Sequence, residues 1–549
     1  MNLNGVYSVN KGYLFYLFVA GFSLGLVACG GKDLDSETEK FGCSSSTSIW
    51  LGPTSLTCNR VDQLAEAFES QPETSILHLT NSVVADRLDL SLFSSQLDSL
   101  QIDDSDIKVL DLSQNTGLRF VNVNSEHIVE IVAPAHKLHS FGLANAVRLR
   151  SSATAIETTT LYIKGAAPET LLSSLVDAEE LQVVRLENSN IDIERVYSLP
   201  NIHSLSLRGM DTSDIDLSHF LELNAVYLYD MTLDDFKIDG SRFIRFCVDS
   251  STIQSLRLLG QSSLSELISL NANMGEIYIE DPTSLNKVQI NNSRIDVFSY
   301  SEWNALTSLV IRGSQIPKVD LTDMVSLAHL ELYEVGIHPD FSNNKVLSRL
   351  TLYGVFDETT KDVDFSSTLI YWLEISGSHL DRVVLPETFE YLDSPDFDDF
   401  GAPSPKVALL SHQSNQIIFE GGAYVERFHF SSMKEQSLLS IDFTSFESLM
   451  SLELTDLWLD VLVLSSFDQL NRFVTRMAEI QSLDLSGLDD IAGLKFVDST
   501  IETLIAPDSF NEDIYSIKDY TYFCRRNKRG NNNFSFSDEM LCRLENDDG

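Results

Sequence analysis

Seven aspartates share one sequence context, in which the aspartate lies between two apolar residues and Ser or Thr follows two positions later. They are Asp89, Asp111, Asp216, Asp320, Asp364, Asp442 and Asp484. If the chain stacks such segments about 5 Å apart, Asp89 and Asp111 become neighbours, and neighbouring carboxylates attract hard cations such as Ca²⁺. Most of the others are separated by segments that carry Lys237, Arg257 or Tyr278. An aspartate that accepts a hydrogen bond from the following turn is therefore the simpler interpretation, and we expect no metal.

Recognisable catalytic signatures are missing from the sequence. It contains no H-E-x-x-H, no G-x-S-x-G, no phosphate-binding loop and no dinucleotide-binding glycine pattern. The cysteine spacing excludes a C-x-x-C zinc site, and histidines such as His78 and His429 are scattered over outward strand positions. We therefore expect neither an enzyme nor a cofactor.

Aromatic and polar side chains at a second set of positions are suited to binding another molecule. Each lies between two apolar residues of a short strand, or directly after them, so its side chain should point outward. The candidate binding residues are Tyr162, Arg185, Tyr227, Gln289, Glu331, Tyr333 and Glu374. Such a face is typical of protein- and glycan-binding surfaces, and a plain solvated sheet is the alternative.

These positions are set by an apolar–polar–apolar triplet that recurs about every 21 residues, a period typical of stacked solenoids. The triplets are Leu77–Leu79, Leu100–Ile102, Val121–Val123, Phe141–Leu143, Leu161–Ile163, Val184–Leu186, Leu205–Leu207, Val226–Leu228, Leu330–Leu332, Leu350–Leu352 and Leu373–Ile375. The aspartate triplets form a second series, offset by half a period. Each triplet is a minimal strand, so we predict a mainly β repeat solenoid with two parallel sheets on opposite sides and roughly 20 coils.

The triplets resemble the leucine-rich repeat family, whose consensus is L-x-x-L-x-L-x-x-N/C-x-L. The pattern fits at Leu327, Leu330, Leu332 and Ile337, and the resemblance extends over residues 76–507. At the Asn/Cys position, Asn115 agrees with the family. The residues that depart from it are Ser189, Met210, Met231, Ser293, Ser314, Val335, Val355, Ser378 and Met433. This departure puts the family's helical convex side in doubt and predicts tighter coils that approach a parallel β-helix.

The N-terminus carries the features of an export signal. Lys11 is the only charge before an apolar run over residues 13–28, which is too short for an ordinary membrane-spanning helix. The run ends in L-V-A-C-G at residues 26–30, which resembles the lipobox of bacterial lipoproteins. An ordinary signal peptide or a signal anchor is the alternative.

The lipobox resemblance implies that residues 1–28 are removed, that Cys29 is lipidated with palmitate, and that residues 29–42 form a flexible tether. Gly30, where an aspartate would favour the inner membrane, implies the outer membrane or cell surface. Export also implies an oxidising compartment.

Both ends of the repeat array are expected to be capped. A helical pattern at Val61, Leu64, Ala65 and Phe68 predicts a capping helix within an N-terminal cap over residues 43–75. Residues 508–549 would form a C-terminal disulfide cap, and the weak repeats from Leu392 to Pro405 would form an inserted loop.

Cysteines flank the array in two pairs. Cys43 with Cys58, and Cys524 with Cys542, would each close a loop of about 15 to 20 residues and stabilise the fold by roughly 3 kcal/mol. Other pairings of these four cysteines remain open. Cys247 is left over; its register points it outward, so either neighbours cover it or the register shifts there.

Charge narrows the possible partners. The chain has 81 acidic and 38 basic residues, a net charge of −43. Such a surface repels nucleic acid and anionic lipid, so we expect membrane contact through the N-terminal lipid alone. The sequence predicts a surface-anchored, non-catalytic protein that binds a protein or glycan. The alternatives are a polysaccharide lyase or hydrolase on a parallel β-helix, and a passive envelope spacer.

Overall fold

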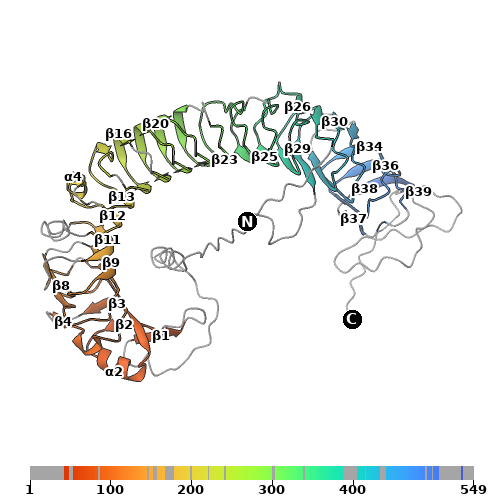
Figure 1. The fold of residues 1–549 in the computed structure, drawn as a ribbon. Helices are drawn as coiled ribbons and strands as arrows, with labels where there is room; N and C mark the ends of the chain where they lie inside the picture. The colour runs from red at the N-terminus through yellow and green to blue at the C-terminus, as the bar shows by residue number, and fades with distance from the viewer. Residues whose placement is uncertain are drawn as a thin grey trace, which may run out of the picture.

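The chain folds into a curved solenoid whose successive coils lie side by side along an arc (Figure 1). The computed structural model describes residues 43–47, 54–83, 87–125, 127–144, 148–151, 157–166, 179–505 and 533–535. Short gaps inside 179–505 fall at 198, 200, 221, 240–242, 299–302, 338–339, 388–404, 415, 433–439, 489–490, 492 and 498. The predicted signal peptide, Cys29, the tether, Cys524 and Cys542 lie outside the described residues, as does nearly all of the predicted inserted loop.

A 22-stranded sheet lines the concave side of the arc. Its strands pair in chain order, parallel throughout except where β1 pairs antiparallel with β2. They are β1 Cys43–Thr47, β2 Thr54–Arg60, β3 Thr74–Val83, β5 Ser99–Asp103, β7 Phe120–Asn124, β9 Leu138–Ala144, β11 Thr158–Lys164, β12 Val183–Glu187, β13 Ser204–Arg208, β15 Ala225–Tyr229, β17 Arg245–Asp249, β19 Glu266–Leu270, β21 Lys287–Asn291, β23 Ser308–Arg312, β24 His329–Tyr333, β25 Arg349–Tyr353, β27 Trp372–Ser376, β29 Lys406–His412, β31 Arg427–Ser432, β33 Ser451–Thr455, β35 Arg472–Arg476 and β37 Gly493–Val497.

The convex side carries four smaller sheets in place of one continuous sheet. Their strands are β4 Arg87–Asp89, β6 Val109–Asp111, β8 Glu130–Ala133 and β10 Arg148–Ser151; β14 Asp214–Asp216, β16 Thr232–Asp239, β18 Thr252–Leu259, β20 Asn273–Ile279 and β22 Arg294–Phe298; β26 Asp362–Asp364, β28 Arg382–Val384, β30 Gln416–Glu420 and β32 Ser440–Asp442; and β34 Trp458–Val463, β36 Glu479–Asp484, β38 Thr500–Ile505 and β39 Asn533–Ser535. The predicted solenoid with parallel strands on two sides, close to a β-helix, is confirmed.

Helix is sparse in the described part of the chain. It comprises α2 (Leu64–Ser70), α4 (Ile193–Val196) and the 3₁₀ turn η2 (Ser91–Phe93). These helices are all too short or too polar to cross a lipid bilayer. The predicted capping helix is present as α2, but Ala65 is exposed and Ala67 is buried in its place. The helix begins at Leu64, three residues later than the pattern indicated, and its buried residues are Leu64, Ala67 and Phe68.

The space between the two sides is filled by apolar side chains from both series of triplets, which form one continuous core. Phe428, from the concave sheet, packs on Phe419, Phe443 and Phe446 of its own and neighbouring coils at ring-centroid distances of 5.0, 5.4 and 5.3 Å. Each coil thus buries its apolar face against the next one, which is the source of stability expected for a repeat array.

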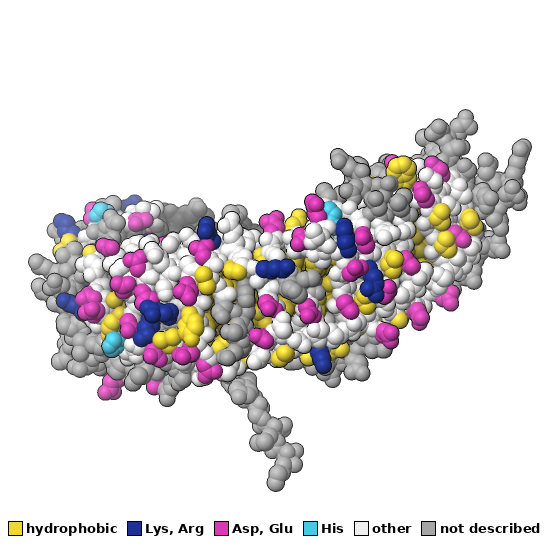
Figure 2. All heavy atoms as spheres, turned by 90° about the horizontal axis from the view of Figure 1, so that it is seen from above, with side chains coloured by type: hydrophobic (Ala, Val, Ile, Leu, Met, Phe, Trp, Pro, Cys, Tyr) yellow, Lys and Arg dark blue, Asp and Glu magenta, His cyan; other side chains and the backbone are white. Residues whose placement is uncertain are grey.

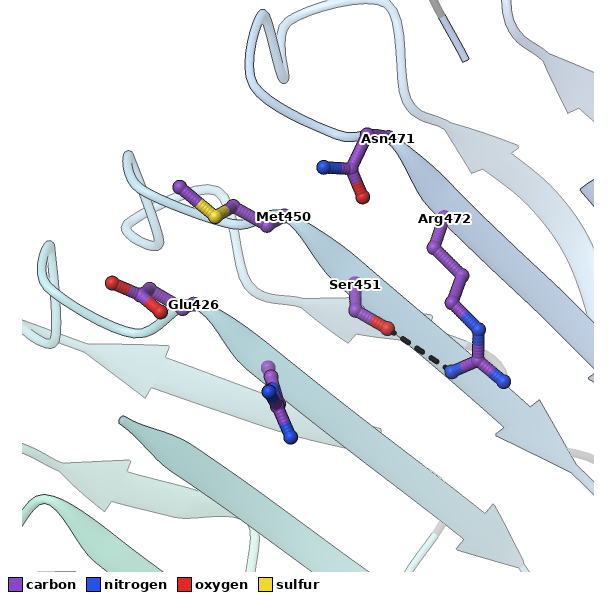
Figure 3. Close-up of a pocket in the computed structure, with 6 residues that line it drawn as sticks. Glu426, Met450, Ser451, Asn471 and Arg472 are labelled. Carbon is purple, nitrogen blue, oxygen red and sulfur yellow. Dashed lines mark hydrogen bonds between the residues drawn. The ribbon is translucent and has the colours of Figure 1, made fainter. Parts of the chain in front are cut away.

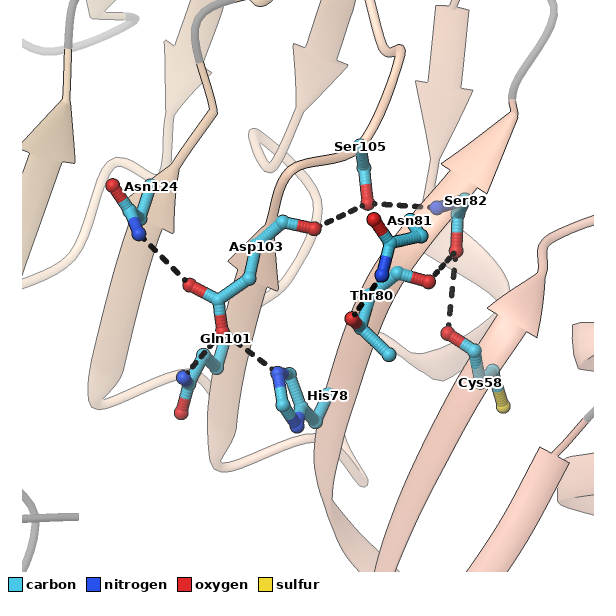
Figure 4. Close-up of polar contacts among 9 residues, drawn as sticks. All are labelled: Cys58, His78, Thr80, Asn81, Ser82, Gln101, Asp103, Ser105 and Asn124. Carbon is cyan, nitrogen blue, oxygen red and sulfur yellow. Dashed lines mark hydrogen bonds and ion pairs between the residues drawn. The ribbon is translucent and has the colours of Figure 1, made fainter. Parts of the chain in front are cut away.

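Buried serines form a ladder at the positions where the leucine-rich repeat consensus has Asn or Cys. Ser293 Oγ donates to the Asn291 carbonyl at 2.9 Å and accepts the Ala272 amide of the preceding coil at 3.1 Å. Ser314 in turn accepts the Ser293 amide at 3.1 Å. Ser82 and Ser105 repeat the arrangement near the N-terminal end (Figure 4). One hydroxyl therefore satisfies two buried backbone groups that belong to adjacent coils.

The backbone turns sharply at the residue just before each ladder position. Asn271, Asn292 and Gly313 have φ values of 49°, 48° and 55°. Only Gly, and to a lesser degree Asn and Asp, adopt this left-handed conformation at low cost, which explains why those types recur there. The turn ends each concave strand and points the ladder residue into the core.

Removing a ladder hydroxyl should destabilise the solenoid. Ser293→Ala leaves the buried Ala272 amide without its acceptor, so we expect a loss of about 1–3 kcal/mol in unfolding free energy. Urea denaturation measures the loss, with Ser262→Ala on a half-exposed turn as the matched control. Equal stability of the two variants would contradict a structural role for the ladder.

Candidate binding surface

The concave sheet presents three columns of outward side chains. In a typical strand such as β13 or β33, the second and fourth residues are buried, whereas the first, third and fifth face outward. Because neighbouring strands pair residue for residue, equal positions lie next to each other along the arc. The spacing within a column is the strand separation, about 4.8 Å.

All seven predicted binding residues lie on this concave sheet. Six occupy the middle column and Tyr333 the third; they come from β11, β12, β15, β21, β24 and β27. The structure brings Tyr162 next to Arg185, and Glu331 shares β24 with Tyr333. The set as a whole is spread along much of the arc. These residues therefore do not form one compact site, and their role in binding stays a prediction.

Several of these residues contact charged neighbours. The Tyr162 hydroxyl donates to Glu187 Oε2 at 2.6 Å, and Arg312 Nη2 lies 2.6 Å from Glu331 Oε1. Tyr333 stacks on Tyr353, with ring centroids 5.6 Å apart and planes inclined by 19°. Tyr353 is 46% exposed and offers an aromatic surface on the concave face.

A polar cluster lies near the N-terminal end of the same face (Figure 4). The Asp103 carboxylate pairs with His78 at 2.8 Å and accepts hydrogen bonds from Gln101 at 2.6 Å and Asn124 at 3.3 Å. Burial alone would raise the pKa of Asp103, but these hydrogen bonds outweigh it, so the pKa lies below its usual value. Side chains of its own coil and of the two neighbouring coils therefore supply the hydrogen-bonding partners of the Asp103 carboxylate.

A more distinctive feature, which the sequence reasoning missed, is a row of cations in the first column. Consecutive register partners run Arg349, Trp372, Lys406, Arg427, Ser451 and Arg472. We call the four cations Arg349, Lys406, Arg427 and Arg472 the basic row. The signal that could have found it is the residue directly before each apolar–polar–apolar triplet, which is the first residue of the strand, as Arg349 is in β25.

Trp372 holds two members of the basic row in place. Its ring lies between the neighbouring strands, with Lys406 Nζ at 4.6 Å and the Arg349 guanidinium carbon at 5.5 Å from the ring centroid. Both are cation–π contacts, which favour positive charge at this point of the surface. Lys406 also lies 3.8 Å from Glu374, one of the predicted binding residues.

Two shallow hollows lie along the basic row. One, of about 250 Å³, is lined by Trp372, Lys406, Arg427, Phe428, His429, Ser451, Glu453 and Arg472. The other, of about 280 Å³, is lined by Glu426, Arg427, Met450, Ser451, Asn471 and Arg472. In Figure 3, Ser451 and Arg472 project from adjacent strands toward one another, joined by a 3.3 Å hydrogen bond. Glu426, Met450 and Asn471 lie directly before strands β31, β33 and β35, respectively.

The middle column beside the row contains carboxylates and imidazoles. Burial would raise the pKa of Glu453, but the Arg476 hydrogen bond at 2.9 Å and nearby positive charge outweigh it, so the pKa is lowered. Burial lowers the pKa of His429 and of His329. A lowered pKa favours the neutral imidazole, so the positive charge of this face comes from Arg and Lys.

The seven aspartates lie on the convex side and bond their own turns. In each case Oδ1 accepts the amide of the residue two positions on, at 2.8 to 3.0 Å. Asp89 and Asp111 are register neighbours, as the spacing suggested. Groups of three or more His, Cys, Asp or Glu side chains that could hold a metal do not occur among the described residues. The turn-bonding interpretation is confirmed.

Acidic and basic side chains do meet on neighbouring convex coils, as the polysaccharide-enzyme alternative requires. Arg257 pairs with Asp235, and Arg382 lies 2.6 Å from Glu420. These pairs are exposed, and exposed ion pairs are usually solvated contacts of little energetic weight. Figure 2, which looks down on the convex side, shows acidic side chains scattered among a few basic ones and not gathered in a cleft.

The cysteines of the described residues differ in state. Cys247 occupies an outward position, yet neighbouring side chains cover it to 8% exposure, and burial raises the pKa of its thiol to about 11. The register therefore does not shift there, and neighbouring side chains cover the outward-pointing Cys247 thiol. Cys58 is disulfide-bonded, and the antiparallel register places it opposite Cys43. The Cys43–Cys58 bond stays a prediction that this register favours.

No protein-family model matches the chain. No curated protein matches it in sequence. Solved structures with a similar outline include a TLR13–ssRNA13 complex, with a TM-score of 0.37 and 14% identity, covering 77% of this chain and 76% of that one. The Arabidopsis receptor kinase HAESA, in complex with the peptide hormone IDA and the co-receptor SERK1, has a TM-score of 0.32 and 14% identity, covering 84% and 88%.

The LRR ectodomain of the Arabidopsis thaliana receptor kinase GASSHO1/SCHENGEN3 is a further similar structure. It has a TM-score of 0.33 and 12% identity, and the match covers 78% of this chain and 64% of that one. The strand pairing of the chain itself shows its fold.

The convex aspartates should be indifferent to calcium. Each carboxylate already accepts a hydrogen bond from a backbone amide, and no group of three acidic, His or Cys side chains surrounds it among the described residues. Millimolar Ca²⁺ or a chelator should therefore leave the melting temperature unchanged. Differential scanning calorimetry with and without Ca²⁺ measures this. A calcium-dependent rise of several degrees, abolished in Asp89→Asn, would contradict the turn-bonding role.

Proposed function

We propose that the chain is a non-catalytic binding protein that recognises another macromolecule through its concave sheet. The observation that carries this proposal is the basic row with its neighbouring aromatic residues, displayed on a continuous face of in-register strands. A passive spacer requires only a solvated surface, so four cations in one column are not expected of a spacer whose net charge is −43. Aromatic, Arg and hydroxyl side chains on one curved face are the groups that binding surfaces use.

The surface is better suited to binding than to catalysis. Its hollows are shallow, and the described carboxylates of the concave face mostly contact neighbouring Arg, Lys or His side chains, as Glu331 and Glu453 do. A general acid or base needs a position beside a bound substrate and a pKa tuned to the reaction. The lowered pKa of Glu453 argues against its acting as a general acid.

The partner we propose is a protein or a glycan. Long-range repulsion from the acidic surface opposes nucleic acid, whose phosphates bind proteins through positive surfaces. An extended concave face suits an extended or convex partner, because each coil adds one more row of side chains to the contact.

Blocking the concave face should abolish binding, whereas blocking the convex face should not. Thr351→Phe and Ser206→Phe add bulk at two points of the middle column, and Ser255→Phe adds the same bulk on the convex strand β18. We expect at least one concave variant to reduce capture of partners from envelope extracts tenfold or more. The convex variant should match the original chain.

The readout is quantitative mass spectrometry of captured proteins and glycans, after circular dichroism has shown that all variants fold alike. Equal capture by all three variants would remove the concave face as the binding site. Capture that is indistinguishable from an empty resin would favour the passive spacer.

We also propose that a lipid on Cys29 anchors the protein to the bacterial envelope, at the outer membrane or cell surface. The support is the sequence at residues 13–30. Cys29→Ser should abolish incorporation of labelled palmitate and move the protein from the membrane to the soluble fraction. Ser23→Ala, in the same apolar run, is the control; continued lipidation of Cys29→Ser would contradict the assignment.

A further inference from the structure

The convex strand β34 exposes three large hydrophobic side chains, more than any other strand with described side chains. Trp458, Val461 and Val463 are 48%, 62% and 50% exposed, and we call them the apolar ridge. Other strands expose at most one such residue, as β22 does with Val297 and β30 with Ile418. Single exposed apolar side chains are ordinary on protein surfaces, whereas a group of three on one short strand is typical of an interaction site.

The next strand leaves the apolar ridge uncovered. Each member of the ridge pairs in register with a polar residue of β36, and these partners are Glu479, Ser482 and Asp484. β34 is also the first strand of its sheet. The ridge is therefore an apolar island on a polar face, and its side chains remain in contact with water.

Carboxylates surround the ridge without accompanying cations. We call Asp460 of β34, Glu479 and Asp484 of β36 and Glu502 of β38 the acidic rim. The basic residues between positions 440 and 505 all belong to the concave strands β35 and β37. Figure 2 shows hydrophobic side chains exposed among acidic ones on the convex side.

The other three convex sheets differ, because each of them pairs arginine with a carboxylate. The pairs are Arg87 with Asp111, Arg257 with Asp235, Arg294 with Asp296 and Arg382 with Glu420. In the sheet of β34, no Lys or Arg of the described residues lies within 4 Å of Asp460, Glu479 or Glu502. The acidic rim therefore keeps its negative charge available to a partner.

Exposed apolar surface and uncompensated negative charge together define the chemistry of that partner. Covering the ridge with apolar side chains removes it from water, which stabilises a complex. Lys and Arg in the partner then face the rim, and the net charge of −43 attracts a basic protein from a distance. The same charge repels anionic lipid, and a second copy of this chain would place one acidic rim against another.

We propose that the apolar ridge and the acidic rim dock a basic, amphipathic segment of another protein. Apolar side chains of that segment cover Trp458, Val461 and Val463, and its Lys and Arg side chains pair with the rim. This surface lies on the opposite side of the solenoid from the concave sheet, so the interaction goes beyond the proposed function and does not depend on it.

The test measures binding of a short amphipathic peptide of Leu and Lys to the full chain by titration calorimetry. Polylysine of the same charge, which has no large apolar side chain, is the comparison ligand. The ridge variant is Val461→Ser with Val463→Ser. The matched control is Tyr278→Ser with Val297→Ser, which removes two exposed apolar side chains from another convex sheet. The fluorescence of Trp458, identified by its loss in Trp458→Phe, reports whether the ridge is covered.

We expect the Leu/Lys peptide to shift the Trp458 emission to shorter wavelength and to bind at least tenfold more weakly to the ridge variant. The control variant should stay within twofold of the original chain, and polylysine should bind both variants equally and weakly. Circular dichroism first shows that the variants fold alike. Equal affinity of the peptide for the ridge and control variants would show attraction by bulk charge alone and overturn the proposal.

The acidic rim is tested by Asp460→Asn with Glu479→Gln. This variant should weaken peptide binding at low salt and have little effect at high salt, because salt screens exposed charges. The matched control, Asp234→Asn with Glu276→Gln, removes the same charge elsewhere on the convex side. An equal loss of affinity in the two variants would overturn the proposal as well.

Other occupants of the ridge give different results. If the chain covers the ridge itself, the peptide binds only after the basic residues Arg525, Arg526, Lys528 and Arg529 are replaced by Ser. If a second copy covers it, sedimentation shows dimers that the ridge variant abolishes. Either result would overturn the proposal. Thr351→Phe, on the concave face, should leave peptide binding unchanged, which separates this proposal from the concave binding function.

Discussion

Parallel backbone pairing between successive coils is the constraint on which the rest of this structure depends. Each concave strand is only about five residues long, too short to be stable alone, and gains its hydrogen bonds from the coils on either side. The same pairing fixes the register, so that leucine-type residues stack inside and outward residues align in columns. A one-residue slip would reverse every side chain of a strand, and the buried core prevents it.

The serine ladder makes this pairing possible at the turn. A coil must leave the sheet and expose backbone groups inside the protein, where unpaired amides are costly. Ser293 and Ser314 satisfy the carbonyl of their own coil and the amide of the preceding one, and left-handed residues such as Asn292 bring them into place. A hydroxyl is shorter than the amide side chain of asparagine, and this suits coils whose convex side is strand and not helix.

The fold was largely predictable from sequence because its signal is repeated many times. Two apolar positions per strand recur in nearly every coil, and the absence of asparagine at the turn correctly pointed away from a helical convex side. The serine ladder was not predicted. Ser189 and Ser293 were seen only as departures from the consensus, because the hydrogen bonds that Ser293 makes to adjacent coils cannot be recognised in the sequence. Ala65 was misplaced because the start of a single short helix has no repeat to correct it.

The binding surface was harder to predict for a physical reason. Outward columns carry no hydrophobic period, so Arg349 and Arg472 stand out only after the register shows that they share one column. The sequence did place Glu331 and Glu374 on the correct face, next to this column, since the triplet alone fixes which side chains point outward. The pairing of charges across strands, as between Arg245 and Glu266, emerges only in three dimensions.

The central claim is that every coil is pinned to its neighbours by short paired strands, so that the concave side is one continuous surface. Hydrogen–deuterium exchange resolved along the chain tests this most directly. The account predicts slow exchange at the concave strands of each coil from β3 to β37, recurring at the coil length with fast exchange at the turns between them. A few compact protected blocks separated by long, rapidly exchanging stretches would contradict it.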